Sequence, residues 1–494
     1  TTSSLNVSIG LEAGRGKTSA PYNSGEANIS IGPYANYDVS TGKRNVSIGG
    51  RAGYEMDTGT DNTLLGNNAG YNVKHAVGAT IIGGYAGRYA TGSYNTFVGY
   101  NSGDGGTSSA PYSSGQNNTA VGASTLVSFT TGHSNVAIGY QAGQSINTAH
   151  ENTIVGYQAG QNVTTADNNV IMGFQAGQSL TSARYNVLIG DGAGKNLTAA
   201  NDNNENVFIG NSAGRMADND EDGVNQGATD NVYVGSGAGY YLDDGAFNVI
   251  IGKEAGKSAS GTQRNAIRNV ILGMEAAKDI TTGDDNVILG YQAGDEITSA
   301  PRNTLIGYQA GDTITNGEQN ILIGYGADVN STAGSNRIGI GYNVSVDTDH
   351  KTVIGASTQT SVLFGGDAHV SSSAASTGSF GHVKAGKVRI LQESDIDLNY
   401  LPNLQFYEEG TYVATLTPQG SGTITVGGGG SPEFNRLGFT RIGNKVHVHG
   451  NINVSSVSSP AGTNIALNLP YPTRTNTVTS NGSLRQTGMV LFYN

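Results

Sequence analysis

The sequence contains no cysteine and no tryptophan, and it is poor in proline and in charged and apolar residues. The absence of cysteine excludes disulfides, thiolate metal sites and cysteine catalysis. No apolar run approaches the ~18 residues of a membrane-spanning helix, so no membrane insertion is predicted. Of the 494 residues, 13% are charged and 36% are hydrophobic. So little apolar material favours a thin, elongated protein over a thick globular core.

Negative charge is in excess, and it is unevenly spread. The net charge is −12, which argues against a nucleic-acid partner. Residues 367–494 carry 8 Lys/Arg and 7 Asp/Glu, a net of +1. The preceding residues hold the other 18 Lys/Arg and 31 Asp/Glu, a net of −13. The chain therefore has a long acidic part and a nearly neutral C-terminal part.

Glycine is abundant, at 75 of 494 residues, because an internal repeat requires it. The segment Asn-Val-Ala-Ile-Gly-Tyr-Gln-Ala-Gly at 135–143 returns in close variants at 152–160 and 169–177. This step, from 135 to 152 and from 152 to 169, is the commonest one, and five other steps are longer. Twenty copies begin at residues 6, 28, 45, 62, 79, 95, 118, 135, 152, 169, 186, 206, 231, 248, 269, 286, 303, 320, 337 and 351.

The positions within a copy predict a short β-strand followed by a turn. Position one is Asn in 17 of the 20 copies, and position five is Gly in all of them. Positions two and four are aliphatic or Thr and share one strand face, because side chains alternate along a strand. Position three is often apolar too, as at Leu64, Ile81 and Ile154. One face can be buried inside a coil, and the other needs a different partner.

Each copy predicts one coil of a β-solenoid. An aliphatic residue recurs at position twelve, as at Ile146, Val163 and Leu180, and predicts a second short strand. Two strands and two turns then make a coil of about 17 residues, and a helical repeat is disfavoured by the glycines and the two-residue period. Twenty coils stacked ~4.8 Å apart would form a shaft of roughly 95 Å over residues 1–366.

The Asn-Val-Ala-Ile-Gly pattern at 135–139 resembles the head repeats of trimeric autotransporter adhesins, and similar repeats occur in bacteriophage tail fibres. The resemblance covers about residues 6–358. It implies a left-handed parallel β-roll with three chains packed side by side, which would cover the second apolar strand face. The coil here is longer than in the adhesins, and no membrane-anchor barrel follows, so the resemblance favours the phage fibre.

The repeat stops near residue 366, and two further segments follow. Residues 367–405 are rich in Ser and Gly and predict a connector. From residue 406 the pattern becomes that of ordinary strands, with clean alternation over 445–454. The stretch 409–418 resembles the opening of the C-terminal β-sandwich domains of phage tail fibres. Residues 406–494 are therefore expected to form a β-sandwich tip.

Two groups of residues are candidates for metal binding. Asp218, Asp220 and Asp222, followed by Gly223, match the start of a calcium loop, although the twelfth position is Thr229 and not Glu. We favour a solvated acidic insertion there, so no cofactor is predicted, and a bound calcium ion is the alternative. His447 and His449 share one face of a strand, and a trimer would bring six such side chains. Without a third ligand, a solvated or interface face is the favoured interpretation.

Side chains at the turn form a further candidate surface. Aromatic residues follow the repeat glycine in several copies, among them Tyr100, Tyr140, Tyr157, Phe174, Tyr291, Tyr308 and Tyr325. One interpretation is that the row of rings binds sugars by stacking. The favoured interpretation is that the rings stack on each other from coil to coil. Gln side chains beside them and the Asn column at position one are read in the same way, as stacked amides.

The function predicted from the sequence is structural and adhesive, not enzymatic. No G-x-S-x-G, H-E-x-x-H or P-loop motif is present. We expect a homotrimeric phage tail fibre in the virion that attaches to other tail or baseplate proteins. Its tip would bind a host cell-surface receptor, a glycan or an outer-membrane protein. The alternatives are a bacterial surface adhesin head, a polysaccharide-degrading tailspike, and lateral binding by the inserted loops at 17–27, 105–117 and 215–230.

Overall fold

The computed structural model describes residues 5–17, 24–106, 112–197, 205–216, 228–242, 244–258 and 265–356, and seven strands between 407 and 467. The chain divides into two compact units, Thr1–Ala368 and His369–Asn494. Every regular element in the described residues is a strand, as predicted for an all-β chain. The predicted connector at 367–405 lies outside the described residues.

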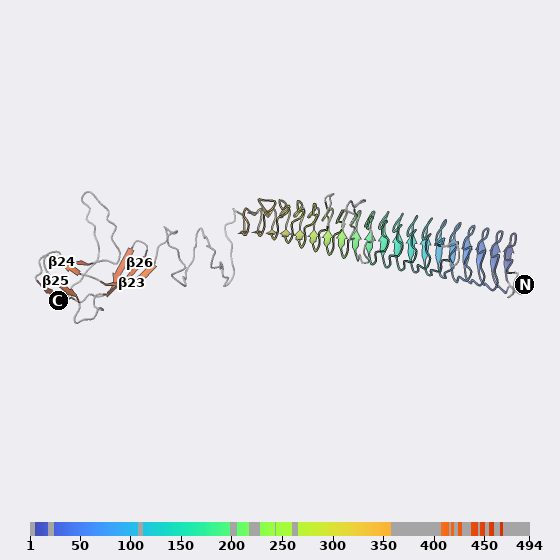
Figure 1. The fold of residues 1–494 in the computed structure, drawn as a ribbon, viewed down its shortest axis with the longest axis horizontal. Helices are drawn as coiled ribbons and strands as arrows, with labels where there is room; N and C mark the ends of the chain where they lie inside the picture. Colours follow the sequence, from blue (N-terminus) through green and yellow to red (C-terminus); the bar gives the residue numbers. More distant parts are fainter. Residues whose placement is uncertain are drawn as a thin grey trace. The chain divides into compact units, whose positions relative to one another are not determined.

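The first unit is a parallel β-solenoid in which each coil contributes one three-residue strand (Figure 1). Each of the twenty strands begins one residue after the start of a repeat, so all twenty copies form coils. The strands are β1 (Val7–Ile9), β2 (Ile29–Ile31), β3 (Val46–Ile48), β4 (Thr63–Leu65), β5 (Thr80–Ile82), β6 (Thr96–Val98), β7 (Thr119–Val121), β8 (Val136–Ile138), β9 (Thr153–Val155), β10 (Val170–Met172), β11 (Val187–Ile189), β12 (Val207–Ile209), β13 (Val232–Val234), β14 (Val249–Ile251), β15 (Val270–Leu272), β16 (Val287–Leu289), β17 (Thr304–Ile306), β18 (Ile321–Ile323), β20 (Ile338–Ile340) and β22 (Thr352–Ile354).

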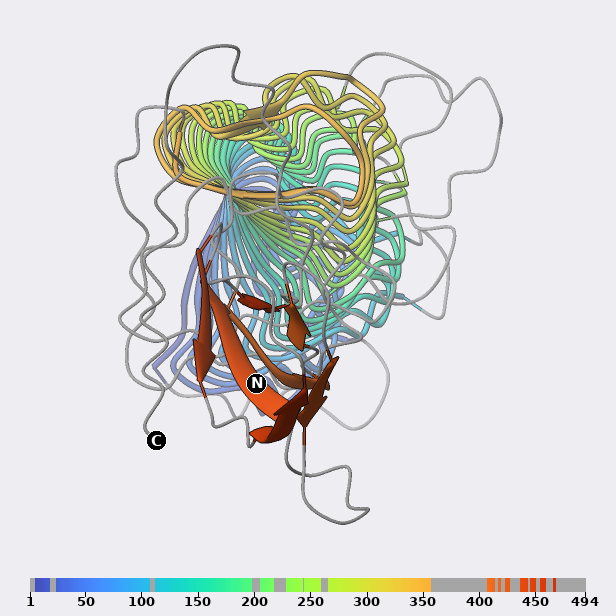
Figure 2. The same ribbon diagram turned by 90° about the vertical axis from the view of Figure 1, so that its left-hand side faces the viewer.

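The strands pair in register, so each repeat position meets the same position of the next coil. Between β8 and β9, for example, Ala137 pairs with Ile154 and Ile138 pairs with Val155. The same pairing holds through the shaft, including across coils with inserted loops. Viewed along the stack, successive coils lie behind one another with a gradual rotation (Figure 2). Each side chain of a strand therefore belongs to a column that runs along the solenoid.

The predicted second strand at position twelve is wrong for most coils. Among the described residues, a second paired strand occurs only at β19 (Asp328–Val329) and β21 (Ser345–Val346). Elsewhere the return segment consists of turns with isolated bridges, such as Lys43 to Thr60. Ile146 and its equivalents are nevertheless fully buried in the core. The residues after the strand must reverse direction several times before the chain reaches the next coil, which leaves no extended run for a second ladder.

The glycine at position five is required for two reasons. Gly156 has a φ of 139°, and the same conformation recurs at this position along the shaft. A Cβ atom on Gly156 would lie 2.3 Å from the carbonyl oxygen of Gly173 in the next coil. Only glycine satisfies both the backbone angle and the close approach of stacked turns.

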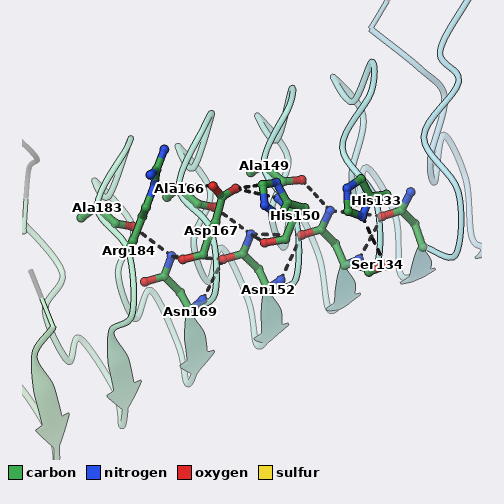
Figure 3. A network of polar contacts seen from close by, with 12 residues as sticks. His133, Ser134, Ala149, His150, Asn152, Ala166, Asp167, Asn169, Ala183 and Arg184 are labelled. Carbon is green, nitrogen blue, oxygen red and sulfur yellow. Dashed lines mark hydrogen bonds and ion pairs between the residues drawn. The ribbon is translucent and has the colours of Figure 1, made fainter. Parts of the chain in front are cut away.

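The core of each coil is closed by small residues and a buried amide ladder. Ile154, Ala159 and Val163 are fully buried inside one coil. The Asn152 side chain donates from Nδ2 to the oxygen of Ala166 (2.8 Å) and to Oδ1 of Asn135 (3.0 Å). Its own Oδ1 accepts the backbone N–H of Asn169 at 3.0 Å (Figure 3). The expected column of stacked amides is thus confirmed, and it satisfies buried backbone groups that the turns leave open.

The amide ladder ends at Arg337, which occupies position one of the nineteenth coil. Its backbone N–H still donates to Oδ1 of Asn320, at 3.1 Å. The guanidinium is almost entirely buried, and it donates to Asp349 Oδ1 (2.8 Å), Asn330 Oδ1 (3.1 Å) and the oxygen of Val346 (2.8 Å). A long side chain with several donors replaces the amide where the coils shorten.

The second unit contains seven described strands in three small antiparallel groups. The first group is β23–β26–β27, and β24 pairs with β29 and β25 with β28. The strands are β23 (Tyr407–Val413), β24 (Leu416–Pro418), β25 (Thr423–Val426), β26 (Arg436–Ile442), β27 (Lys445–His449), β28 (Val454–Ser458) and β29 (Ile465–Leu467). The packing of these groups into a sandwich remains a prediction.

Candidate interaction surfaces

The outward face of the twenty-stranded sheet is an apolar surface that runs along the shaft. The middle residue of each strand points into the coil, and the residues on either side of it point outward. Ile138, Met172 and Ile251 are each 39% exposed, although they belong to continuous aliphatic columns. This confirms the expectation that one strand face is buried within the coil and the other is left without a partner in a single chain.

The aromatic residues after the repeat glycine stack on each other. The ring centroids of Tyr140 and Tyr157 are 5.3 Å apart, and those of Tyr157 and Phe174 are 5.2 Å apart. A second stack runs from Tyr291 through Tyr308 and Tyr325, and on to Tyr342. Neighbouring rings cover each other's faces, so a sugar has access to ring edges and to the two ends of each stack. The favoured interpretation of self-stacking is therefore correct for these rings.

Tyr100 is the exception in this group. The equivalent position in the next coil is Ala123, which has no ring on which Tyr100 could stack. The ring instead meets Tyr85 edge to face, with centroids 5.9 Å apart, and the residue is 62% exposed.

Amide ladders run beside the aromatic stack. Gln158 donates from Nε2 to Oε1 of Gln141 at 2.9 Å, and Gln175 donates to Gln158 over the same distance. A parallel ladder that the sequence reading missed joins Gln161 to Gln144 at 3.1 Å and continues to Gln178. The signal was present in the sequence, because all these residues recur with the same step as the repeat itself.

A polar cluster that the sequence reading also missed joins four successive coils. His133, His150, Asp167 and Arg184 occupy the same position of their coils and form one column (Figure 3). The two imidazole rings stack with centroids 4.9 Å apart. Asp167 is nearly buried, and its Oδ1 lies 3.0 Å from Nδ1 of His150 and accepts the backbone N–H of the same residue. Oδ2 lies 3.4 Å from Nε of Arg184, so the carboxylate is shared by two partners.

Carboxylates form a column of like charge near the C-terminal end of the shaft. Asp295, Asp312 and Asp328 follow one another in successive coils. Partial burial, with the hydrogen-bonded Asp312 carboxyl beside it, raises the pKa of Asp328 to about 7. Thr313 stabilises this carboxyl by donating from Oγ1 to Oδ2 at 2.5 Å. Burial and the neighbouring carboxylates, first Asp312, also raise the pKa of Asp295.

The described part of the chain does not test either predicted metal site. Asp218, Asp220 and Asp222 lie outside the described residues. His447 and His449 lie on β27, where they pair with Thr440 and Gly438 of β26. Among the described residues, no three His, Asp or Glu side chains are arranged to hold a metal ion. The two metal hypotheses therefore remain predictions.

Two further observations complete the description. No helix among the described residues is long and apolar enough to cross a membrane. Comparison with known protein families, curated proteins and solved structures gave no match to this chain.

Proposed function

We propose that the chain is a homotrimeric fibre protein of a bacteriophage virion. Its solenoid would be the shaft, wound left-handed as the resemblance to adhesin heads implies. Residues 406–494 would be the tip that attaches to a receptor on the host cell, and the N-terminal part would attach to other tail or baseplate proteins. In this proposal the protein has no catalytic activity.

The observation that carries the proposal is the outward apolar face of the sheet. It runs without interruption from β1 to β22, and its two columns contain only aliphatic residues and Thr. A surface this long and uniform suits an equally long and uniform partner, which two further copies of the same solenoid provide. A three-chain rod would bury these columns along a common axis.

The energy available per coil is modest, but it accumulates over the length of the shaft. Two outward aliphatic side chains that are each about 40% exposed offer about 3 kcal/mol per coil on burial, at ~25 cal/mol per Å². Ordering and association costs oppose this gain, but they do not grow in proportion to coil number. We therefore expect an obligate trimer for a shaft of twenty coils.

Sedimentation tests the assembly. The full chain at micromolar concentration should sediment as a trimer, and a folded monomer would contradict the proposal. Replacing Ile138 and Met172 together with Gln should weaken association, because both point outward from the sheet. The matched control replaces the exposed Thr148 and Thr165 with Gln and should remain trimeric.

The place of the protein in the virion, and the role of its tip, are tested on particles and cells. Antibodies against residues 1–366 should label fibres on phage tails, whereas labelling of a bacterial outer surface would favour the adhesin. The full chain should bind host cells, and a chain ending at residue 366 should not. Binding by the truncated chain would instead place recognition in the inserted loops of the shaft. Release of oligosaccharide from host capsule would favour the tailspike.

A further inference from the structure

Two exposed columns flank the outward apolar face, one at each end of the strands. The leading column consists of the residue just before position one of each repeat, and the trailing column of the residue just after the repeat glycine. Tyr94 and Phe247 of the leading column are 58% and 59% exposed. Tyr100 of the trailing column is 62% exposed. Both columns thus place large apolar or charged groups in solvent beside a face that already lacks a partner.

Threefold symmetry would bring these two columns together. If the three apolar faces turn toward a common axis, the strands run around it in the same sense. The trailing end of each strand then meets the leading end of the strand in the neighbouring copy. A closed three-membered ring permits no axial shift between copies, because any shift would continue into an open helix. Each level would therefore pair the two flanking residues of the same coil number.

The flanking residues of one level are chemically complementary. The coil of β14 pairs Phe247 with Lys253. This places a cation beside a ring that is 59% exposed, which is favourable when the ring face is accessible.

A shift by one coil in one direction would remove this match. Lys253 of the trailing column would then face Arg268 of the leading column, and Asp191 would face Glu205. At equal levels, none of the described coils places two charges of the same sign opposite each other. Like charges across an interface cost affinity and suppress wrong arrangements, so the two flanking columns disfavour this shift.

Resting on the trimer proposed above, we infer that the leading column of each copy docks on the trailing column of the next at the same coil level. The partner is a second copy of this chain, and the contact lies at the three corners of the trimer. The aliphatic columns between the flanks supply most of the buried area. The leading and trailing columns determine which faces turn inward and at which coil level the copies meet.

Engineered cysteines test this arrangement on the full chain, which has no cysteine of its own. Asn117 and Ala123 flank β7, and neither is a large or charged residue. The double variant Asn117→Cys with Ala123→Cys should form disulfides between copies under mild oxidation. The same two positions lie at opposite ends of β7, whose three residues alone span about 10 Å, so they cannot bridge within one chain.

The matched control moves one cysteine by two coils. Glu151 lies two coils from Asn117 in the leading column, a rise of about 10 Å, which is too far for a disulfide with the level of Ala123. In non-reducing gels the Asn117/Ala123 variant should run at three times the chain mass. The Glu151→Cys, Ala123→Cys variant should run as single chains.

The outcomes separate this inference from the trimer itself. A sedimenting trimer without cross-links in the Asn117/Ala123 variant would overturn the inferred contact but not the assembly. Equal cross-linking of both double variants would show that the levels are not fixed, and would also overturn it. A monomer of the unmodified chain would refute the proposed trimer and this inference together.

Discussion

Replacing Gly156 with Val should break the stacking of the solenoid at its ninth coil. The residue has a φ of 139°, a region that is closed to a β-branched side chain. Its Cβ would also lie 2.3 Å from the oxygen and 2.7 Å from the carbon of the Gly173 carbonyl. Both neighbours are backbone atoms of a turn that is itself held by the next coil, so they cannot move aside as a flexible side chain would.

The expected loss of stability is about 2–6 kcal/mol. A residue held in a glycine-only region costs about 1–3 kcal/mol, and overpacking against fixed atoms adds a similar amount. The cost falls on the interface between two coils, and stability in a repeat array depends on such nearest-neighbour interfaces. The shaft should therefore begin to unfold at this coil before the rest of it melts.

Two controls separate the steric requirement from a general effect of mutation. Replacing the exposed Asn147 with Ser should change the unfolding free energy by less than ~0.5 kcal/mol. Gly192 has a φ of 62°, and a Cβ there would meet only the Ser212 hydroxyl, at 3.6 Å. Gly192→Gln should be tolerated, because Gln175 adopts this conformation at the same position of the previous coil. Thermal unfolding followed by circular dichroism measures all three, and equal melting temperatures for Gly156→Val and Asn147→Ser would refute the reasoning.

Two more variants test the buried polar columns. Asn152→Asp should destabilise the shaft by about 3 kcal/mol at neutral pH, because a carboxylate would face the oxygens of Ala166 and Asn135. The control Asn162→Asp lies on the exposed surface and should cost less than ~0.5 kcal/mol. Chemical denaturation measures the unfolding free energy of both variants. The raised pKa of Asp328 means that the folded shaft holds a proton that the unfolded chain releases above about pH 4, so wild-type stability should fall as the pH rises from about 4 to about 7. Asp328→Asn should reduce this loss of unfolding free energy by about 2 kcal/mol, after allowance for solvent screening. The variant should melt at a higher temperature than wild type at pH 8 but not at pH 4. An unchanged dependence of stability on pH would contradict the assignment.

The strands and the strand-ending turn were predictable because their residues are nearly invariant from coil to coil. Gly at position five and Asn at position one each have one physical role, and alternation fixes which strand face is inside. The same reasoning identified the outward face as the one without a partner. All twenty strands begin where the repeat predicted, including β13, which follows the longest step between copies, from 206 to 231.

The return half of the coil was harder to predict from the sequence. A buried aliphatic residue such as Ile146 suggests a strand, although burial alone does not require extended backbone. The backbone there turns repeatedly, with positive φ at Gln141 and Gly143, before it reaches Ile146. Gln at a left-handed corner carries no signal comparable to that of glycine. The position-twelve residue therefore indicated the core correctly and the secondary structure incorrectly.

The side-chain columns were missed where their residue identity changes along the shaft. His133, His150, Asp167 and Arg184 occupy one column, but their four identities share no pattern that a repeat alignment emphasises. Their link becomes visible only once the coils are stacked in register. Columns of identical residues, such as the tyrosines, are predictable from the sequence, and columns of complementary residues require the register.

The stacking distance then decides which residue types a column tolerates. Neighbouring side chains in a column lie about 5 Å apart, so each contacts a residue of the same type or one of complementary chemistry. Amides and rings gain from meeting their own kind, because an amide both donates and accepts and rings attract when offset. Charged side chains do not gain from neighbours of the same type, because like charges repel each other. Two arrangements of charged residues occur along the shaft. Arg44 with Asp61, and Arg268 with Asp285, alternate in sign and form two-point ion pairs between coils.

Where carboxylates follow one another, as at Asp312 and Asp328, alternation is absent and a proton takes the place of the missing cation. This carboxyl pair lies where coil geometry changes, since β19 begins at Asp328 and the last step between copies, from 337 to 351, is the shortest in the shaft. Arg337, which closes the amide ladder in the next coil, supplies its charge to Asp349 and not to this pair. The C-terminal end of the shaft should therefore be a part whose stability responds to pH.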